Sequence, residues 1–220
     1  MLSNKLYIFD LDGTLLNTIG DLAEACDHVM RSHCHPTHTY EEYCSFVGNG
    51  IRRLVEQALP MDCRQTEYLE QCKQEFVAYY STHIDHKTHP YAGIVELLEE
   101  LQLSKAKIAV ASNKFHEGTV KLISKFFPHI HFTDVYGNME GMPLKPDPEL
   151  IEKIISKAGV AHTEVTMIGD SSVDIQTAHN AHIRSIGVSW GFRSRTELEQ
   201  ACPTHIVDNM DQLRKLLMTV

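Results

Sequence analysis

The fold is decided by the stretch Tyr7-Ile8-Phe9-Asp10-Leu11-Asp12-Gly13-Thr14, in which an apolar run leads directly into two carboxylates. A short apolar run that ends at a turn signal is typical of a buried strand. We therefore expect Asp10 at the carboxyl end of a strand that enters the core, where open α/β sheets place their ligands. A loop of free N–H groups there suits an anion, and two acids beside an anion suit a divalent metal. The alternative is an ordinary Asp-Gly turn after a strand.

Further apolar runs alternate with amphipathic stretches along the chain. The runs lie at 6–9, 108–111, 165–168 and 183–188, with weaker candidates at 132–136 and 205–207. The amphipathic stretches lie near 94–101, 117–127, 148–158 and 172–181. Strands that alternate with helices of this length predict an α/β fold, a Rossmann-like parallel sheet with helices on both faces.

Residues 15–85 interrupt this alternation, because they show helical periodicity without a convincing strand. The clearest helical face is formed by Ile51, Leu54, Val55, Ala58 and Leu59. Its i, i+3, i+4, i+7, i+8 spacing is that of one side of an amphipathic helix. The sequence therefore predicts an α/β core at 1–14 and 86–220, with an inserted all-helical cap at 15–85.

Charge and composition narrow the class of protein. The 220 residues carry a net charge of −9, which argues against nucleic acid or an anionic membrane as the main partner. The chain shows neither a signal sequence nor a long apolar span, so we expect a cytoplasmic protein, with a monomer as the default state. The six cysteines form no C-x-x-C pair and are expected to be reduced. The histidine clusters at 33–38 and 83–89 leave a metal site open, but scattered surface histidines are favoured because neither cluster has the i, i+4 pair plus acid of a known helical site.

Polar residues also follow the other predicted strands. The stretch Ser112-Asn113-Lys114 is expected as a polar turn after 108–111, Lys145 precedes a helix, and Asp170 and Asp174 follow 165–168. Each has an ordinary alternative: a helix cap, a solvated lysine, or acids at a helix N-terminus. A parallel sheet brings all of them to one edge, beside Asp10 and Asp12. Four carboxylates at one place repel strongly unless a metal is bound, so the joint pattern favours a metal site.

These residues resemble the four ordered motifs of the haloacid dehalogenase superfamily. The motifs are Asp10-Leu11-Asp12-Gly13-Thr14, Ser112, Lys145, and Gly169-Asp170-Ser171-Ser172-Val173-Asp174. Within the superfamily the chain looks like a phosphoglycolate phosphatase-type hydrolase with a helical cap inserted after the first motif. The supporting features are Phe46-Val47-Gly48-Asn49-Gly50, Lys145-Pro146-Asp147-Pro148 and Gly187-Val188-Ser189-Trp190-Gly191. The family's common Asp-Ser after the first motif is Asn17-Thr18 here.

The resemblance implies a role for each motif residue. Asp10 would be the nucleophile that forms an aspartyl-phosphate, and Asp12 would be the general acid and then the base. Mg²⁺ would be held by the Asp10 carboxylate, the Asp12 backbone carbonyl and Asp170. The phosphoryl group would be bound by Ser112, Lys145 and backbone N–H groups near Leu11 and Asn113. Asp174 would orient a metal-bound water or Lys145, and Thr14 would brace the loop.

The substrate implied is a small phosphorylated metabolite, with phosphoglycolate the leading choice. A sugar phosphomutase and a nucleotide or pyrophosphate phosphatase share the same core and stay open. A dehalogenase is disfavoured because its first motif lacks the second acid, and a phosphonate hydrolase because the only cap lysine, Lys73, lies outside the expected motif. A non-catalytic phosphate-binding protein ranks low, since every catalytic position is filled.

Two cap residues are candidates for binding the leaving group of the substrate. Arg52 and Arg53 point away from the apolar face of the helix that follows Gly50. The glycines around Asn49 would let this helix N-terminus approach the site closely. We hypothesise that Arg52, or failing that Arg53, meets an anionic leaving group when the cap closes. Two solvated surface arginines are the alternative.

Overall fold

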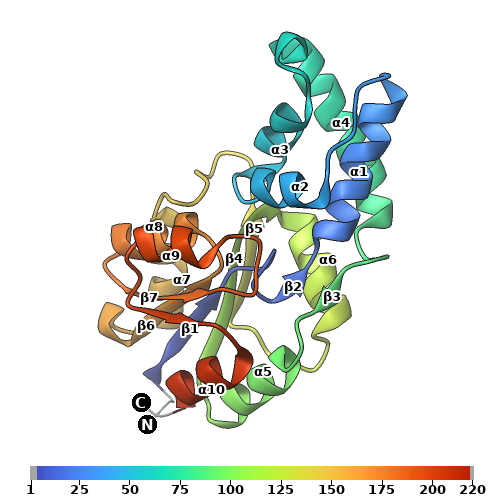
Figure 1. Cartoon of the computed structure of the whole chain (residues 1–220). Coiled ribbons are helices and arrows are strands. Elements are labelled where there is room, and N and C mark those ends of the chain that lie inside the picture. The colour runs from blue at the N-terminus through green and yellow to red at the C-terminus, as the bar shows by residue number, and fades with distance from the viewer. Residues whose placement is uncertain (1–3, 219–220) are drawn as a thin grey trace.

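The computed structural model describes residues 4–218. Its centre is a six-stranded parallel sheet with strand order β5-β4-β1-β6-β7-β8 (Figure 1). The strands are β1 (Leu6–Phe9), β4 (Lys107–Phe115), β5 (Asp134–Asn138), β6 (Val165–Gly169), β7 (Arg184–Val188) and β8 (His205–Val207). Every apolar run predicted as a strand is therefore part of this sheet, with small shifts of its ends. The predicted α/β fold with a parallel sheet is confirmed.

Alternate side chains of the sheet enter two separate apolar clusters. Tyr7 and Phe9 of β1 belong to one cluster, and Leu6 and Ile8 belong to the other. This follows from the period of two along a strand, which sends neighbouring side chains to opposite faces. Both faces are covered, as expected for a parallel sheet.

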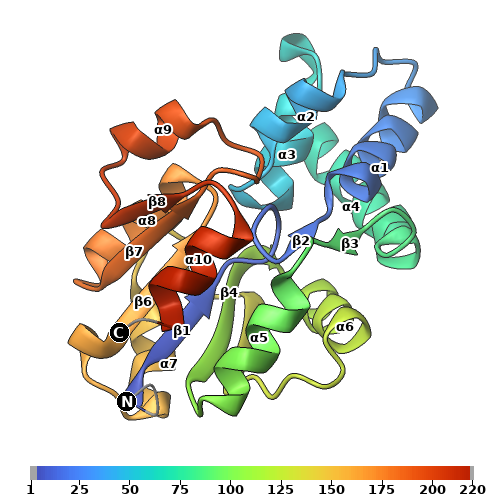
Figure 2. The ribbon, with the colours of Figure 1, turned by 60° about the horizontal axis from the view of Figure 1, so that its bottom comes forward.

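Six helices accompany the sheet strands. They are α5 (Ile94–Leu103), α6 (His116–Phe126), α7 (Glu149–Ala158), α8 (Ser172–Asn180), α9 (Arg195–Gln200) and α10 (Met210–Met218). Helices α5 and α10 contact each other and cover one face of the sheet (Figure 2), whereas the buried side chains of α7 belong to the cluster on the other face. Short 3₁₀ turns lie at Met61–Cys63 and His162–Glu164.

Four helices between β1 and α5 form a separate group above the sheet edge in Figure 1. They are α1 (Ile19–Ser32), α2 (Tyr40–Phe46), α3 (Gly50–Ala58) and α4 (Thr66–His83). We call this helical segment the cap. Thr39 and Glu42 form a capping box at the start of α2. The predicted apolar face of α3 is largely buried, with Ile51 half-buried at its margin. The division into two domains with bounds at 14 and 86 stays a prediction.

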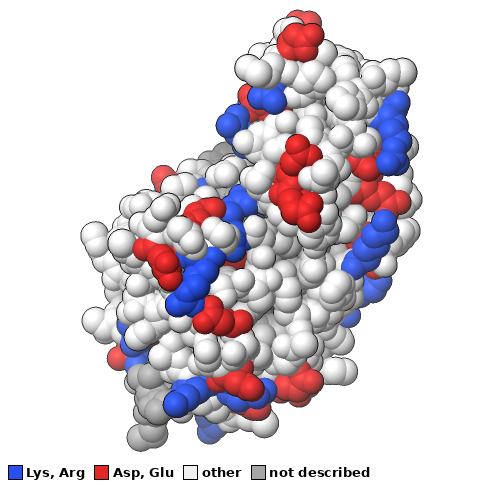
Figure 3. All heavy atoms as spheres, in the orientation of Figure 1, with Lys and Arg blue, Asp and Glu red and all other residues white. Residues whose placement is uncertain are grey.

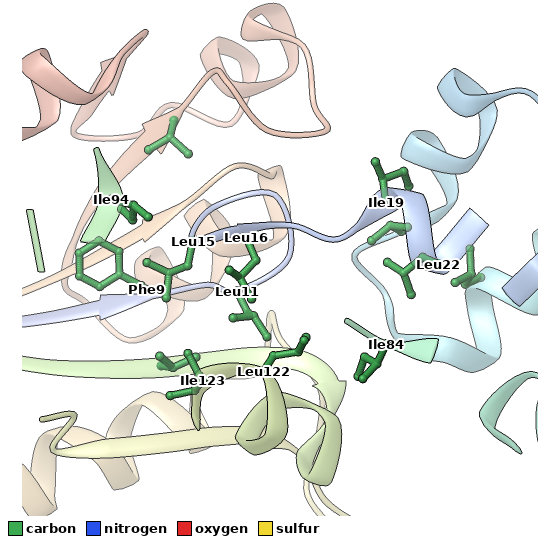
Figure 4. Close-up of a cluster of buried hydrophobic side chains, with 14 of the residues drawn as sticks. Phe9, Leu11, Leu15, Leu16, Ile19, Leu22, Ile84, Ile94, Leu122 and Ile123 are labelled. Carbon is green, nitrogen blue, oxygen red and sulfur yellow. The ribbon is translucent and has the colours of Figure 1, made fainter. Parts of the chain in front are cut away.

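The two connections between cap and core pair as a short antiparallel ribbon, which the sequence did not predict. Strand β2 (Leu16–Asn17) pairs with β3 (His89–Pro90). The carboxylate of Asp21, buried in α1, accepts bonds from the backbone N–H groups of Lys87 and Thr88 and from the Thr88 hydroxyl, at 2.7–3.0 Å. Apolar side chains continue from the sheet into the cap beside this ribbon (Figure 4). The cap is therefore held to the core at a defined place.

Strand β4 also differs from the prediction at its end. The stretch Ser112-Asn113-Lys114 was expected as a turn after the strand, but β4 runs on to Phe115. Its pairing with β5 is irregular between Ala111 and Phe115, because the polar side chains there turn to other partners. The polar stretch is therefore a distorted strand end.

Charged side chains of both signs are mixed over the face of the molecule in Figure 3. Among residues 4–218, the structure contains no helix long and apolar enough to cross a membrane.

Candidate active site

The candidate site lies at the carboxyl edge of the sheet, where β1 and β6 run side by side. Asp10 directly follows β1, and Asp170 directly follows β6. The Asp10 backbone N–H donates to the Ile168 carbonyl at 2.9 Å, which extends the backbone pairing of β1 with β6 to Asp10. The sheet therefore brings together residues that lie far apart in the sequence, as predicted.

Three buried carboxylates form the centre of the site. Asp10, Asp170 and Asp174 each offer an oxygen, and these oxygens lie within 4.8 Å of one another. Lys145, itself buried, donates from Nζ to Asp10 Oδ1 at 2.8 Å and to Asp174 Oδ1 at 2.7 Å. Its ammonium also donates to the Ala111 carbonyl at 2.8 Å. One lysine thus holds two of the three acids.

Burial and mutual repulsion shift the pKa values of these groups. Burial raises the pKa of Asp10 to about 7, against the opposing effect of Lys145 and with a smaller push from Asp174. The pKa of Asp170 is raised well above its usual value, first by burial and then by Asp174 and Asp10. Burial acts to lower the pKa of Lys145, but the adjacent Asp10 and Asp174 outweigh it and raise that pKa. The protein alone therefore does not fully compensate the charge of this cluster.

The two acids of the last motif differ in their partners. Asp174 is fully engaged, because its Oδ1 accepts from Lys145 while its Oδ2 accepts from the Ser171 backbone N–H and hydroxyl in the capping box of α8. Asp170 accepts from the Phe192 backbone N–H at 2.7 Å and, weakly, from the Thr14 hydroxyl at 3.5 Å. Within residues 4–218, no lysine or arginine makes a salt bridge with Asp170.

This arrangement suits a metal ion. Hard divalent cations bind carboxylate and carbonyl oxygens, and a bound cation would offset the charge that raises the pKa values of Asp10 and Asp170. Among the described residues, the three acids are the one group of this kind that could hold a metal ion. The histidine clusters form no such group there; His33, for example, pairs with Glu75 at 2.7 Å.

Asn113, which follows Ser112, forms hydrogen bonds with both the cap and the core. The Asn113 side-chain amide donates to the carbonyls of Gly48 and Lys145, and its oxygen accepts from the Lys145 backbone N–H, at 2.8–3.0 Å. The buried Ser112 hydroxyl accepts from the Lys114 backbone N–H at 3.2 Å and also lines the cavity described next. The Asn113 side chain is thus committed to contacts within the protein.

A cavity lies over the acids, between the core and the cap. The cavity and its open mouth together span about 610 Å³ of empty space. The core contributes four acids, Asp10, Asp12, Asp170 and Asp174, and the polar residues Ser112 and Asn113. It also contributes three cations, Lys114, Lys145 and Arg193. The cap contributes mostly apolar groups and glycines, namely Leu22, Val47, Gly48, Gly50, Ile51 and Leu54, with Tyr80. The site can therefore hold a small anion beside the acids.

The two cap arginines lie elsewhere. Arg52 pairs with Glu70 at 2.9 Å and Arg53 with Glu56 at 2.7 Å, and both arginine side chains are 51% exposed. Neither lines the cavity. Their proposed contact with a leaving group requires movement of the cap and stays a prediction.

Three residues at the cavity were missed by the sequence reading. Lys114 contacts Asp12 and Tyr80, and Arg193 donates to carbonyls at the end of α2 and beyond it, among them Ser45 at 3.2 Å and Val47. The position of Lys114 was open to prediction, because it belongs to the polar stretch after 108–111, all three residues of which line the cavity. Tyr80 and Arg193 carried no comparable signal, since their partners are distant in sequence or are backbone carbonyls.

Comparisons with known proteins agree with this geometry. A phosphoglycolate phosphatase from Agrobacterium fabrum is 32% identical over 220 residues, covering 97% of this chain and 92% of that protein. One from Photobacterium profundum is 31% identical, covering 95% and 93%. A solved structure of a putative phosphoglycolate phosphatase from Lactobacillus delbrueckii subsp. bulgaricus superposes with a TM-score of 0.91 at 30% identity, covering 98% of each chain. The model of the haloacid dehalogenase-like hydrolases matches residues 7–188. The chain therefore belongs to the haloacid dehalogenase-like hydrolase family and is a phosphoglycolate phosphatase-like enzyme.

Proposed function

We propose that this enzyme is a Mg²⁺-dependent phosphatase that hydrolyses a small phosphomonoester, with phosphoglycolate as the first candidate, through an aspartyl-phosphate on Asp10. The observation that supports this proposal most strongly is the position of Lys145. Its ammonium donates hydrogen bonds to both Asp10 and Asp174 at the floor of a cavity. The curated relatives named phosphoglycolate phosphatase support the choice of substrate.

In the first half of the reaction, a carboxylate oxygen of Asp10 attacks phosphorus and the ester P–O bond breaks. The departing oxygen takes a proton from the Asp12 carboxyl, which lines the same cavity two residues along the chain. The products of this half are the free alcohol and a phosphoryl group bonded to Asp10.

Negative charge on the phosphoryl oxygens shifts while the bonds to phosphorus form and break, so hydrogen-bond donors must already lie around these oxygens. Ser112, Lys145 and the backbone N–H groups of Leu11 and Asn113 fill this role in the proposal. Lys145 is suited to it because its contacts with Asp10, Asp174 and Ala111 fix its ammonium in place.

Mg²⁺ would be held by the Asp10 and Asp170 carboxylates and by the Asp12 backbone carbonyl. When bound, it supplies positive charge that favours the ionised form of Asp10 and draws electron density from a phosphoryl oxygen. Asp174 would act behind these ligands by fixing Lys145, which is consistent with its full set of hydrogen bonds.

In the second half, Asp12 takes a proton from water, the water oxygen attacks phosphorus, and the bond to Asp10 breaks to release inorganic phosphate. The cap, proposed as residues 15–85 against a core of 1–14 and 86–220, would limit the access of bulk water. Its apolar lining suits a small leaving group. A cytoplasmic location and a monomeric state stay predictions.

The test is phosphate release from p-nitrophenyl phosphate with Mg²⁺ and with EDTA, followed by a panel of phosphorylated metabolites. The panel contains phosphoglycolate, nucleotides, pyrophosphate and sugar phosphates. We expect phosphate release with Mg²⁺ but not with EDTA, and the highest kcat/KM for phosphoglycolate. Conversion of one sugar phosphate into its isomer would favour a mutase, and no turnover of any compound would favour a phosphate-binding protein.

A further inference from the structure

Lys114 is a buried lysine that contacts Asp12, the proposed general acid and base. Its side chain is 2% exposed, and its Nζ donates to Asp12 Oδ1 at 3.0 Å and to Asp12 Oδ2 at 3.3 Å. The same ammonium donates to the Tyr80 hydroxyl oxygen at 2.7 Å and lies 4.7 Å from the centre of the Tyr80 ring. Both oxygens of Asp12 therefore face one buried cation.

A buried ammonium is costly unless its charge and its hydrogen bonds are satisfied. Here one partner comes from the core and the other from the cap, because Tyr80 is a fully buried residue of α4. Lys114 thus joins the acid/base to a cap helix through two direct contacts. The Tyr80 ring also packs beside Phe76 and Phe115, which limits how far its hydroxyl can move.

The position of the Asp12 carboxylate depends on this contact. An aspartate has two freely rotating side-chain bonds, and a group that transfers a proton must lie within hydrogen-bond reach of the reacting oxygen. Lys114 is the side chain that hydrogen-bonds both Asp12 oxygens. A misplacement of about 1 Å at such a group can cost roughly a hundredfold in rate.

We propose that Lys114 is a positioning residue: it fixes the Asp12 carboxylate at the leaving-group side of the cavity, and Tyr80 ties that position to cap helix α4. This inference rests on the proposed role of Asp12 in the phosphatase reaction. It adds two residues to the machinery of the site, one from the core and one from the cap.

The test uses three substrates that differ in their leaving groups. Nitrophenolate leaves as a stable anion and needs little help from an acid, whereas ethyl phosphate and phosphoglycolate both release an alkoxide that must be protonated. Ethyl phosphate lacks the carboxylate of phosphoglycolate. The ratio kcat/KM covers only the steps through departure of the leaving group, whereas kcat also contains the hydrolysis of the aspartyl-phosphate, which all three substrates share. A defect in the position of Asp12 therefore lowers kcat/KM for both alkyl esters and spares kcat/KM for p-nitrophenyl phosphate.

For Lys114→Met we expect kcat/KM to fall roughly 10- to 100-fold on both alkyl esters, a part of what general acid–base catalysis contributes. The kcat/KM for p-nitrophenyl phosphate should change by less than about threefold, because its leaving group needs little help from an acid and the phosphoryl site is intact. Tyr80→Phe keeps the ring but removes the hydroxyl, so we expect the same pattern at smaller size. If Lys114→Met fails to fold by circular dichroism, Tyr80→Phe carries the test alone.

Lys121→Met is the matched control. Lys121 also reaches from the core to the cap, donating to the Ser81 carbonyl at 3.0 Å, but it is exposed and lies outside the cavity lining. We expect it to leave all three substrates unchanged.

Equal losses of kcat/KM on all three substrates in Lys114→Met would overturn the proposal, because they would indicate general damage to the site. A loss of kcat/KM confined to phosphoglycolate would also overturn it, because Lys114 would then bind the substrate carboxylate. A failure of the proposed function looks different: wild type would turn over no substrate, or the losses of kcat/KM in Asp12→Asn would be no larger for the alkyl esters than for p-nitrophenyl phosphate.

Discussion

Gly13 lies directly against the carboxylate of Asp170, so that a Cβ atom added to Gly13 would overlap both Asp170 oxygens and their carbon. Gly13 also has a φ of +84°, in the left-handed region that side chains disfavour. The loop after Asp10 and the loop after β6 therefore meet without space for a methyl group. The metal-binding geometry proposed for Asp170 depends on this contact.

Gly13→Ala should therefore abolish most phosphatase activity. The added methyl group has to displace the Asp170 carboxylate, and the left-handed backbone costs a further ~1–2 kcal/mol. The control is Gly141→Ala, because Gly141 has a φ of +82° but no atom within 4 Å of an added Cβ. Steady-state assays should show loss in the first variant and activity near wild type in the second. Comparable activity in both would contradict the contact.

Mg²⁺ should raise thermal stability through Asp170. A ligand that binds only the folded state stabilises it by about 2.7 kcal/mol at a hundred times its Kd. For a chain of this size that corresponds to a rise in Tm of roughly 5–10 °C. Asp170→Asn should remove most of this rise in scanning calorimetry. Equal shifts in wild type and variant, or none in wild type, would place the metal elsewhere.

The metal-free protein should lose stability as the pH rises toward neutral. Burial raises the pKa of Asp10 from 3.8 to about 7, so between these values the folded state holds a proton that the unfolded state has released. The free energy of unfolding therefore falls with rising pH across this range and levels off above it. Asp10→Asn removes this titration, and its Tm in EDTA should decline less than that of wild type between about pH 4 and 7. Parallel declines would show that Asp10 is not the group responsible.

The cap arginines are tested by substrate selectivity. If Arg52 leaves Glu70 and reads the substrate carboxylate when the cap closes, Arg52→Ala should lower kcat/KM for phosphoglycolate far more than for p-nitrophenyl phosphate. A lost charged hydrogen bond corresponds to roughly 1.5–3 kcal/mol of such selectivity. Arg53→Ala serves as the neighbouring comparison. Small, equal effects in both variants would assign these arginines to the solvated surface.

The sequence predicted the residues that stand at strand ends, and it failed where contacts cross between cap and core. Asp10 and Asp170 were predictable because each follows an apolar run, and a parallel sheet brings such ends to one edge. The partnership of Lys114 with Tyr80 was not predictable, because it depends on how α4 packs over the core. The β2–β3 ribbon was missed for a related reason. Its strands have two residues each and are too short for a period of two to appear.

In the proposed mechanism Asp10 carries the phosphoryl group, and trapping that intermediate tests this role most directly. Wild type and Asp12→Asn are mixed with phosphoglycolate and Mg²⁺, quenched in acid, digested and analysed by mass spectrometry. We expect one added phosphoryl group on the peptide that contains Asp10. It should accumulate more in Asp12→Asn, which lacks the base that assists its hydrolysis, and be absent from Asp10→Asn, which should show no turnover. A phosphoryl group on another residue, or turnover near wild type in Asp10→Asn, would contradict the assignment of Asp10 as the nucleophile.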